Sequence, residues 1–223
     1  MRNWYTIKAA ADKTAEIYIY EEIGDFWGEG VAARTFVKDL TALKVSLINL
    51  RINSPGGNVF DGFAIYNALV RHPARVLVDI DGLAASAASY VALAGNEIRM
   101  AQNASIMIHN PQGGVLGDAS DMRKVASILD EIKASIVGIY AARVKQEEEQ
   151  IRSWMDAESW FNADQAKAIG FVDEITPNLN VSNSYNLSRY KHAPLHLMGN
   201  ASASGRYAEK FTRMAHAIAK QGV

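Results

Sequence analysis

The sequence contains no cysteine. This absence excludes thiol catalysis, cysteine-ligated zinc and disulfide bonds. The chain also has no excess of one charge, because 23 Lys and Arg residues face 24 Asp and Glu residues, so bulk charge selects neither nucleic acid nor an anionic membrane as a partner. No run approaches the ~18 apolar residues of a membrane span, and the first residues lack the apolar core of a signal peptide. We therefore expect a protein of the cytoplasm.

Two patterns that imitate ligand sites are incomplete. Residues 28–33, GEGVAA, resemble a dinucleotide fingerprint, but the next strand ends without the ribose-binding acid expected about 20 residues further on. His192 and His196 are separated by Pro194, which argues against a shared helical face that would hold a metal. We expect neither a cofactor nor a metal.

Short β-branched runs alternate with helical patterns in the first half of the chain. The sequence of 223 residues, 49% of them hydrophobic, is long enough for one sizeable α/β domain. The spacing of apolar residues predicts strands at 16–20, 45–52, 75–80, 97–100 and 105–109, with helices at about 29–42, 58–71 and from 85 onward. This order is typical of stacked βαβ units around a mainly parallel sheet.

A long helical pattern begins at Asp118, with Asp121 as a capping acid in its first turn, and its apolar residues continue to Val144. It is either one helix that projects to pack on another subunit or a kinked pair of core helices. From Pro177 the composition shifts to Asn, Ser and Leu. We expect a main domain at 1–176, a linker or loose excursion at 177–205 and an amphipathic helix at 206–223.

The segment Gly82-Leu83-Ala84-Ala85-Ser86 follows the apolar run at 75–80. A strand that breaks at Gly82 and restarts as a helix near Ser86 would place this hydroxyl beside unsatisfied helix N–H groups. That is a suitable position for an acyl-transfer nucleophile, and equally for an ordinary helix-capping serine. The segment alone leaves both interpretations open.

Two other strand ends carry residues that fit acyl transfer. Gly56 and Gly57 form a strand-to-helix turn that can present a backbone N–H to an oxyanion, and His109 ends the predicted strand at 105–109. Because sites in open α/β sheets gather beyond the carboxyl ends of strands, His109 could reach Ser86 as a general base. Glu158 or Asp156, which we expect on a loop, could orient the imidazole.

Four segments together resemble the Clp protease proteolytic subunit family (ClpP, peptidase S14), in the family's order, within residues 16 to 175. They are 52–57 (INSPGG), 82–86 (GLAAS), 106–111 (IMIHNP) and 160–173 (WFNADQA to GFVD). The resemblance implies Ser86 as nucleophile, His109 as general base, and the N–H groups of Gly57 and Ala87 as the oxyanion hole. Glu158 falls where the family usually has its catalytic aspartate, and Asp156 is the reserve.

The resemblance implies an α/β, ClpP/crotonase-like fold of stacked βαβ units with a long protruding helix for oligomerisation. It also implies a serine endopeptidase that cleaves polypeptides inside a homo-oligomeric ring of about six or seven subunits, single or double. The segment before Glu16 does not resemble the family's axial loops, so we do not expect a Clp ATPase partner. The divergent opening, the glutamate and the extended tail are similar to phage and prophage head maturation proteases, whose substrates are capsid or scaffold proteins.

Two other functions remain as alternatives. A crotonase-type acyl-CoA enzyme would use similar N–H pairs for an enolate, but it leaves the pair Ser86 and His109 without a role. A non-catalytic ring that acts as an assembly scaffold would tolerate an incomplete triad. Labelling by a fluorophosphonate, or turnover of CoA esters, would separate these functions.

Overall fold

A computed structural model describes residues 4–9, 12–24, 32–180, 185, 187–194 and 197. The chain divides into two compact units, Met1–Ser182 and Asn183–Val223. The sheet and the named helices belong to the first unit, and the described part of the second includes a turn in which the Tyr190 N–H donates to the Leu187 carbonyl at 2.9 Å. The helix predicted at 206–223 lies outside the described residues, as does part of the predicted 177–205 segment.

Strands and helices alternate through most of the first unit, and the predicted α/β class is confirmed. The strands are β1 (Tyr5–Ala9), β2 (Thr14–Ile19), β3 (Leu47–Ser54), β4 (Arg75–Ala85), β5 (Glu97–Ala101), β6 (Ser105–Ile108), β7 (Ser159–Asn162) and β8 (Glu174–Thr176). The helices are α1 (Ala33–Ala42), α2 (Val59–Arg71), α3 (Ala87–Ala92), α4 (Ala119–Ala141), α5 (Glu148–Asp156) and α6 (Ala163–Ile169). The order from β2 to β5 consists of stacked βαβ units.

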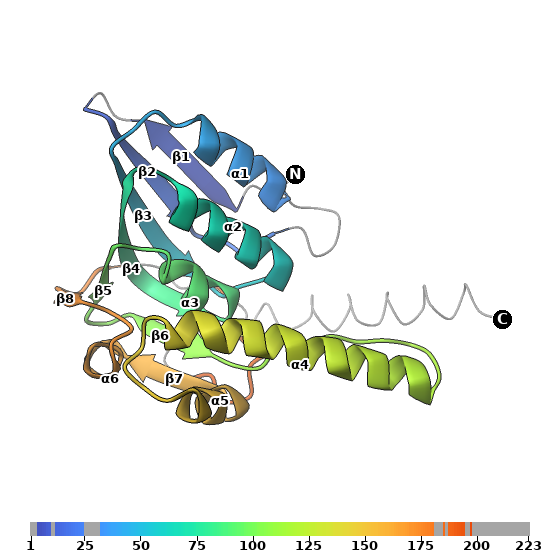
Figure 1. Ribbon diagram of the computed structural model, residues 1–223. Coiled ribbons are helices and arrows are strands. Elements are labelled where there is room, and N and C mark those ends of the chain that lie inside the picture. Colours follow the sequence, from blue (N-terminus) through green and yellow to red (C-terminus); the bar gives the residue numbers. More distant parts are fainter. Residues whose placement is uncertain are drawn as a thin grey trace. The chain divides into compact units, whose positions relative to one another are not determined.

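The strands form one mainly parallel sheet in the order β1-β2-β3-β4-β5-β8, with β6 paired to β4 and β7 paired to β6. Helices α1, α2 and α3 lie on one face of the sheet (Figure 1). Alternate residues of β3, namely Ile48, Leu50 and Ile52, are fully buried, which is the pattern of a strand with one covered face. Strand β1 was not predicted; it pairs antiparallel with β2 and forms one edge of the sheet.

Strand β4 extends beyond its predicted end. We predicted that it would stop at residue 80 and break at Gly82, but it continues to Ala85, and α3 begins at Ala87. The reason lies in its partners: Leu77–Ile80 pair with β5, whereas Leu83–Ala85 pair with β6. The small residues therefore form the last part of a buried strand.

Helix α4 is one continuous helix of 23 residues, so the kinked pair is not formed. The predicted cap is confirmed, since Asp118 and Asp121 form a capping box. The buried residues of α4, from Ile132 onward, lie in its C-terminal half. The N-terminal half extends beyond the sheet (Figure 1) and carries exposed Met122 and Ile128. No helix in the described ranges is long and apolar enough to cross a membrane.

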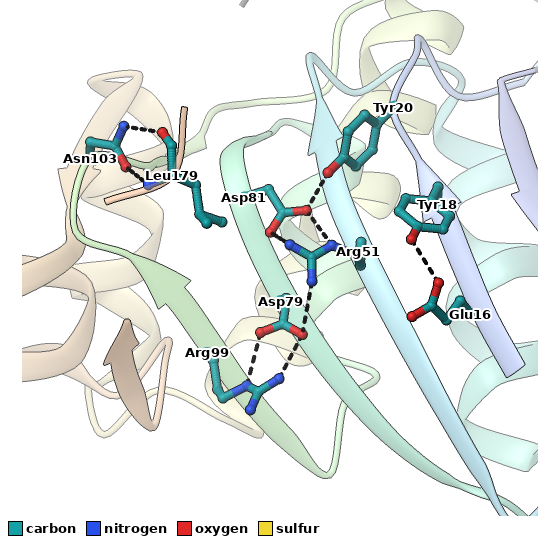
Figure 2. Close-up of polar contacts among 9 residues, drawn as sticks. All are labelled: Glu16, Tyr18, Tyr20, Arg51, Asp79, Asp81, Arg99, Asn103 and Leu179. Atoms are coloured by element: carbon teal, nitrogen blue, oxygen red, sulfur yellow. Dashed lines mark hydrogen bonds and ion pairs between the residues drawn. The ribbon is translucent and has the colours of Figure 1, made fainter. Parts of the chain in front are cut away.

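A network of charges crosses the strands on the sheet face opposite α1 to α3. Figure 2 shows Arg51 of β3 bound through two nitrogens to Asp81 of β4, which also accepts a hydrogen bond from Tyr20. Asp79 accepts two hydrogen bonds, of 2.9 and 2.8 Å, from Arg99 of β5. The Asp81 side chain is 1% exposed, so its charge depends on these partners for the solvation that water would otherwise provide.

We expect Asp81→Asn to lower the free energy of unfolding by about 3 kcal/mol, because it leaves the Arg51 guanidinium without its buried carboxylate. Glu97→Gln is the control, since Glu97 pairs with Arg75 in an exposed bridge between β5 and β4 and its loss should cost no more than about 1 kcal/mol. Urea unfolding at equal protein concentration measures both variants. Equal losses would contradict a special role for the buried pair.

Candidate active site

Ser86 lies in a strained turn between β4 and α3. Its backbone has φ +54° and ψ −124°, a conformation that side-chain-bearing residues rarely adopt. The Ser86 N–H donates to the Met107 carbonyl of β6 at 2.9 Å, which holds the turn against the sheet. The neighbouring residues Ala85 and Ala87 are buried, whereas Ser86 is only half-buried. The turn therefore presents the hydroxyl at the surface of a rigid core.

The side chains of His109 and Ser86 meet at this turn. His109 directly follows β6, whose residues 105–107 run parallel to the end of β4. Its Nε2 lies 2.8 Å from Ser86 Oγ, within hydrogen-bond distance. The carboxyl ends of adjacent parallel strands thus bring together a hydroxyl and an imidazole that are 23 residues apart, in a geometry suited to proton transfer.

The Gly56–Gly57 turn packs directly against Ser86. A Cβ on Gly56 would lie 2.7 Å from Ser86 Cβ and 2.9 Å from the Ala87 nitrogen, so only glycine fits there. The Gly56 carbonyl accepts from Ile23 N–H and the Asn58 N–H donates to the Ile23 carbonyl, at 2.8 and 3.0 Å. Because alternate amides of an extended chain point to opposite sides, the Gly57 N–H points away from Ile23.

Ala87 is the first residue of α3, so its N–H has no acceptor within that helix. The preceding carbonyl, that of Ser86, accepts from the Ser89 N–H at 2.9 Å and from the Ser89 hydroxyl. Ser89 Oγ in turn lies 2.7 Å from the hydroxyl of Tyr140 in α4. Neither Ser89 nor Tyr140 was predicted from the sequence as part of this site. Ser89 could have been predicted, because it is a second hydroxyl residue one helical turn after Ser86.

Glu158 is buried in the turn between α5 and β7. It follows the last turn of α5, where its N–H donates to the Met155 carbonyl at 3.2 Å and its φ is +49°. Antiparallel pairing of β6 and β7 ends with Ile108 opposite Ser159, so His109 and Glu158 each lie one residue beyond the last pair, at the same end of the two strands. Glu158 is 6% exposed.

Asp156 has a different environment. It is the last residue of α5 rather than part of the predicted loop, and its side chain is 58% exposed. Its carboxylate accepts hydrogen bonds from Asn110 Nδ2 at 2.7 Å and from Lys133 of α4. Lys133, and to a smaller extent Asn110, lower the pKa of the Asp156 carboxyl below its ordinary value. Asp156 therefore joins α5, α4 and the segment after His109 through an ionised carboxylate.

The described residues hold no cluster of three or more His, Asp or Glu arranged for a metal ion. His196 lies outside them, and His192 is exposed. Residues 28–31, most of the segment that resembles a dinucleotide fingerprint, also lie outside the described residues.

A sequence model of the Clp protease family matches residues 1–178. Similar curated proteins include an ATP-dependent Clp protease proteolytic subunit 2 from Mycolicibacterium paratuberculosis, 36% identical over 130 residues. A proteolytic subunit 1 from Mycobacterium leprae is 35% identical over 137 residues, and a proteolytic subunit 2 from Thermobifida fusca is 38% identical over 133.

The aligned stretches cover 57%, 60% and 59% of this chain, and 65%, 68% and 66% of these three relatives. The family model extends further along this chain, across the sheet from β1 to β8 and the turn that carries Ser86. With that coverage, the chain belongs to the Clp protease family.

Proposed function

We propose that this chain is a serine endopeptidase in which Ser86 is the nucleophile and His109 the general base. The observation that carries the proposal is the 2.8 Å separation of Ser86 Oγ and His109 Nε2 at a strained turn. Membership of the Clp protease family supports it. The same pair of side chains argues against a crotonase-type reaction, in which neither has a role.

In the first half of the reaction, His109 Nε2 takes the Ser86 hydroxyl proton as Oγ attacks the carbonyl carbon of a peptide bond. The N–H groups of Gly57 and Ala87 donate to the oxyanion of the tetrahedral intermediate. When the C–N bond breaks, His109 returns the proton to the leaving amine and an acyl-serine remains. Water then attacks the ester as His109 takes its proton. When the Oγ–acyl bond breaks, His109 returns that proton to Ser86 Oγ and the carboxylic acid is released.

We propose Glu158 as the acid that orients the imidazole. Its burial and its place next to the β6–β7 strand end that His109 follows favour it over Asp156, which is exposed and already engaged with Lys133. Glutamate is one methylene longer than the family's usual aspartate. The left-handed backbone at Glu158 gives that longer side chain a different starting direction from an ordinary strand residue.

We expect Ser86→Ala to abolish peptide cleavage and fluorophosphonate labelling, because no other group takes the place of the attacking oxygen. Ser135→Ala, which removes an exposed hydroxyl from the C-terminal half of α4, should leave both unchanged. Fluorogenic peptides and an unfolded protein, each assayed without ATP, provide the measurement. Equal cleavage by Ser86→Ala and the parent would disprove the mechanism. Turnover of CoA esters would favour the crotonase alternative, and an assembled but inert and unlabelled parent would favour the scaffold.

Glu158→Gln should lower kcat by 10²–10⁴-fold, since a neutral amide cannot stabilise the imidazolium or hold its tautomer. Asp156→Asn is the matched control, in which a neighbouring carboxylate becomes an amide; we expect a change of no more than about threefold. Steady-state kinetics on one peptide compares the two. The opposite ranking would make Asp156 the orienting acid.

We also propose a homo-oligomeric ring with contacts through the N-terminal half of α4 and the segment before it. The support is an apolar surface outside the core: Leu116 is 75% exposed, Met122 54% and Ile128 42%. Single exposed apolar residues are ordinary, but a projecting helix that carries several is typical of an interaction surface.

The double variant Met122→Asp, Ile128→Asp should sediment as a smaller species than the parent, because buried carboxylates oppose apolar contact between subunits. Ser135→Asp adds a charge to the exposed side of the other half of α4 and should keep the parent's assembly. Analytical ultracentrifugation measures both, and circular dichroism checks that the helix is retained. An unchanged sedimentation coefficient in the double variant would contradict this interface.

We further propose that the enzyme works without a Clp ATPase, as a phage or prophage head maturation protease on capsid or scaffold protein in the host cytoplasm. Strand β1 supports the first part, since residues 5–9 pair along β2 as an edge strand rather than forming an axial loop. The glutamate in the acid position and the segment after residue 176 support the proposed role in head maturation.

A further inference from the structure

A chain of hydroxyl groups connects α4 to the peptide bond between Ser86 and Ala87. The Ser89 hydroxyl donates to the Ser86 carbonyl at 2.5 Å. Ser89 Oγ also lies 2.7 Å from the Tyr140 hydroxyl, and either atom of that pair could be the donor. Because the single Ser89 hydrogen is used on the carbonyl, the Tyr140 hydroxyl must donate to Ser89. The chain therefore runs in one direction, from Tyr140 through Ser89 to the Ser86 carbonyl.

Both hydroxyl groups are fixed in the core. Ser89 is 2% exposed and Tyr140 is 1% exposed. The Tyr140 ring packs edge-on against Phe171 with a centroid distance of 5.8 Å. Burial raises the pKa of the Tyr140 hydroxyl above its ordinary value, so this hydroxyl is protonated at neutral pH and can donate.

The Ser86 carbonyl and the Ala87 N–H belong to the same planar peptide group and point in opposite directions. Hydrogen bonds that fix the carbonyl oxygen therefore fix the direction of the Ala87 N–H. They also polarise the amide, and a polarised amide has a stronger N–H donor. The Ser89 N–H also donates to the Ser86 carbonyl at 2.9 Å, so the hydroxyl chain adds to a backbone hydrogen bond in holding this peptide group beside a residue with a strained φ.

We propose that Ser89 and Tyr140 are positioning residues that orient and polarise the Ala87 N–H for the oxyanion. The inference rests on the proposed function, in which Ala87 supplies one of the two oxyanion donors. Neither residue touches the substrate; each acts through the Ser86–Ala87 peptide group.

The test compares Tyr140→Phe and Ser89→Ala with Tyr90→Phe. Tyr90 is the matched control because it is a buried tyrosine of α3 that does not belong to this series of hydroxyl groups. Its hydroxyl donates to the Val59 carbonyl at 2.9 Å. We expect Tyr140→Phe to lower kcat about tenfold with KM within about twofold, a part of the 10²–10³-fold that loss of a whole oxyanion donor costs. The inhibition constant of a peptide aldehyde, whose adduct places an oxyanion at Ala87, should rise by the factor by which kcat/KM falls. Tyr90→Phe should keep the parent's kcat.

Coupling between the residues gives a second criterion. Because Tyr140 acts through Ser89, Tyr140→Phe should have no further effect on kcat in a Ser89→Ala background. Independent, multiplying losses would overturn the chain, as would an unchanged kcat in Tyr140→Phe. An equal loss in Tyr90→Phe would show a general loosening of α3 and would also overturn it.

Failure of the proposed function gives a different result. If the parent neither cleaves peptides nor reacts with a fluorophosphonate, the function proposed above is wrong. The effect on the peptide group is then measured by the Ala87 amide proton resonance, in protein labelled at alanine. This resonance should move upfield in Tyr140→Phe, because the Ser86–Ala87 amide is then less polarised, and it should stay in place in Tyr90→Phe. An unmoved resonance in both variants would disprove polarisation of this amide by Tyr140.

Discussion

The candidate site depends on the way strand β4 changes partner along its length. Its first part pairs with β5 and its last part with β6, while β3 runs along its other edge. This divided pairing carries the backbone past Gly82 to a common end with β6, so Ser86 and His109 finish on the same side of the sheet. A strand that stopped at residue 80 would leave the hydroxyl without an imidazole. The pairing of β4 with β6 therefore sets the relative positions of Ser86 and His109.

Close packing of small residues follows from the same register. Gly56 has a φ of +87°, and a side chain there would also contact the Ala85 carbonyl at 2.5 Å. Gly57 has still less room, since a Cβ would lie 2.1 Å from the Ile23 carbonyl oxygen. The two turns can approach each other only because both are built from residues with little or no side chain. That approach places Gly56 beside the Ala87 nitrogen.

The features predicted correctly from the sequence are those that apolar periodicity and helix capping control. Helix α2, predicted at 58–71 and found at Val59–Arg71, and the Asp118 cap of α4 are local patterns with local causes. The end of β4, the strand β1 and the helix α5 were not predicted, because sheet pairing and tertiary burial decide them. The choice between Glu158 and Asp156 has the same origin. Spacing alone does not separate two acids two residues apart, and only the family resemblance favoured Glu158. Their environments differ in the fold, which buries Glu158 and binds Asp156 to Lys133 of α4.

Helix α4 joins two environments in one rigid element. Its C-terminal half is seated in the core, where Tyr140 meets Ser89 and Lys133 meets Asp156. Its N-terminal half lies outside the core and carries the apolar surface through which we propose that subunits meet. A continuous α-helix transmits a displacement along its axis with little loss, because each turn is hydrogen-bonded to the next. Under both proposals, contacts on the projecting half act on the same helix that meets the Ser86–Ala87 peptide group through Tyr140 and Ser89.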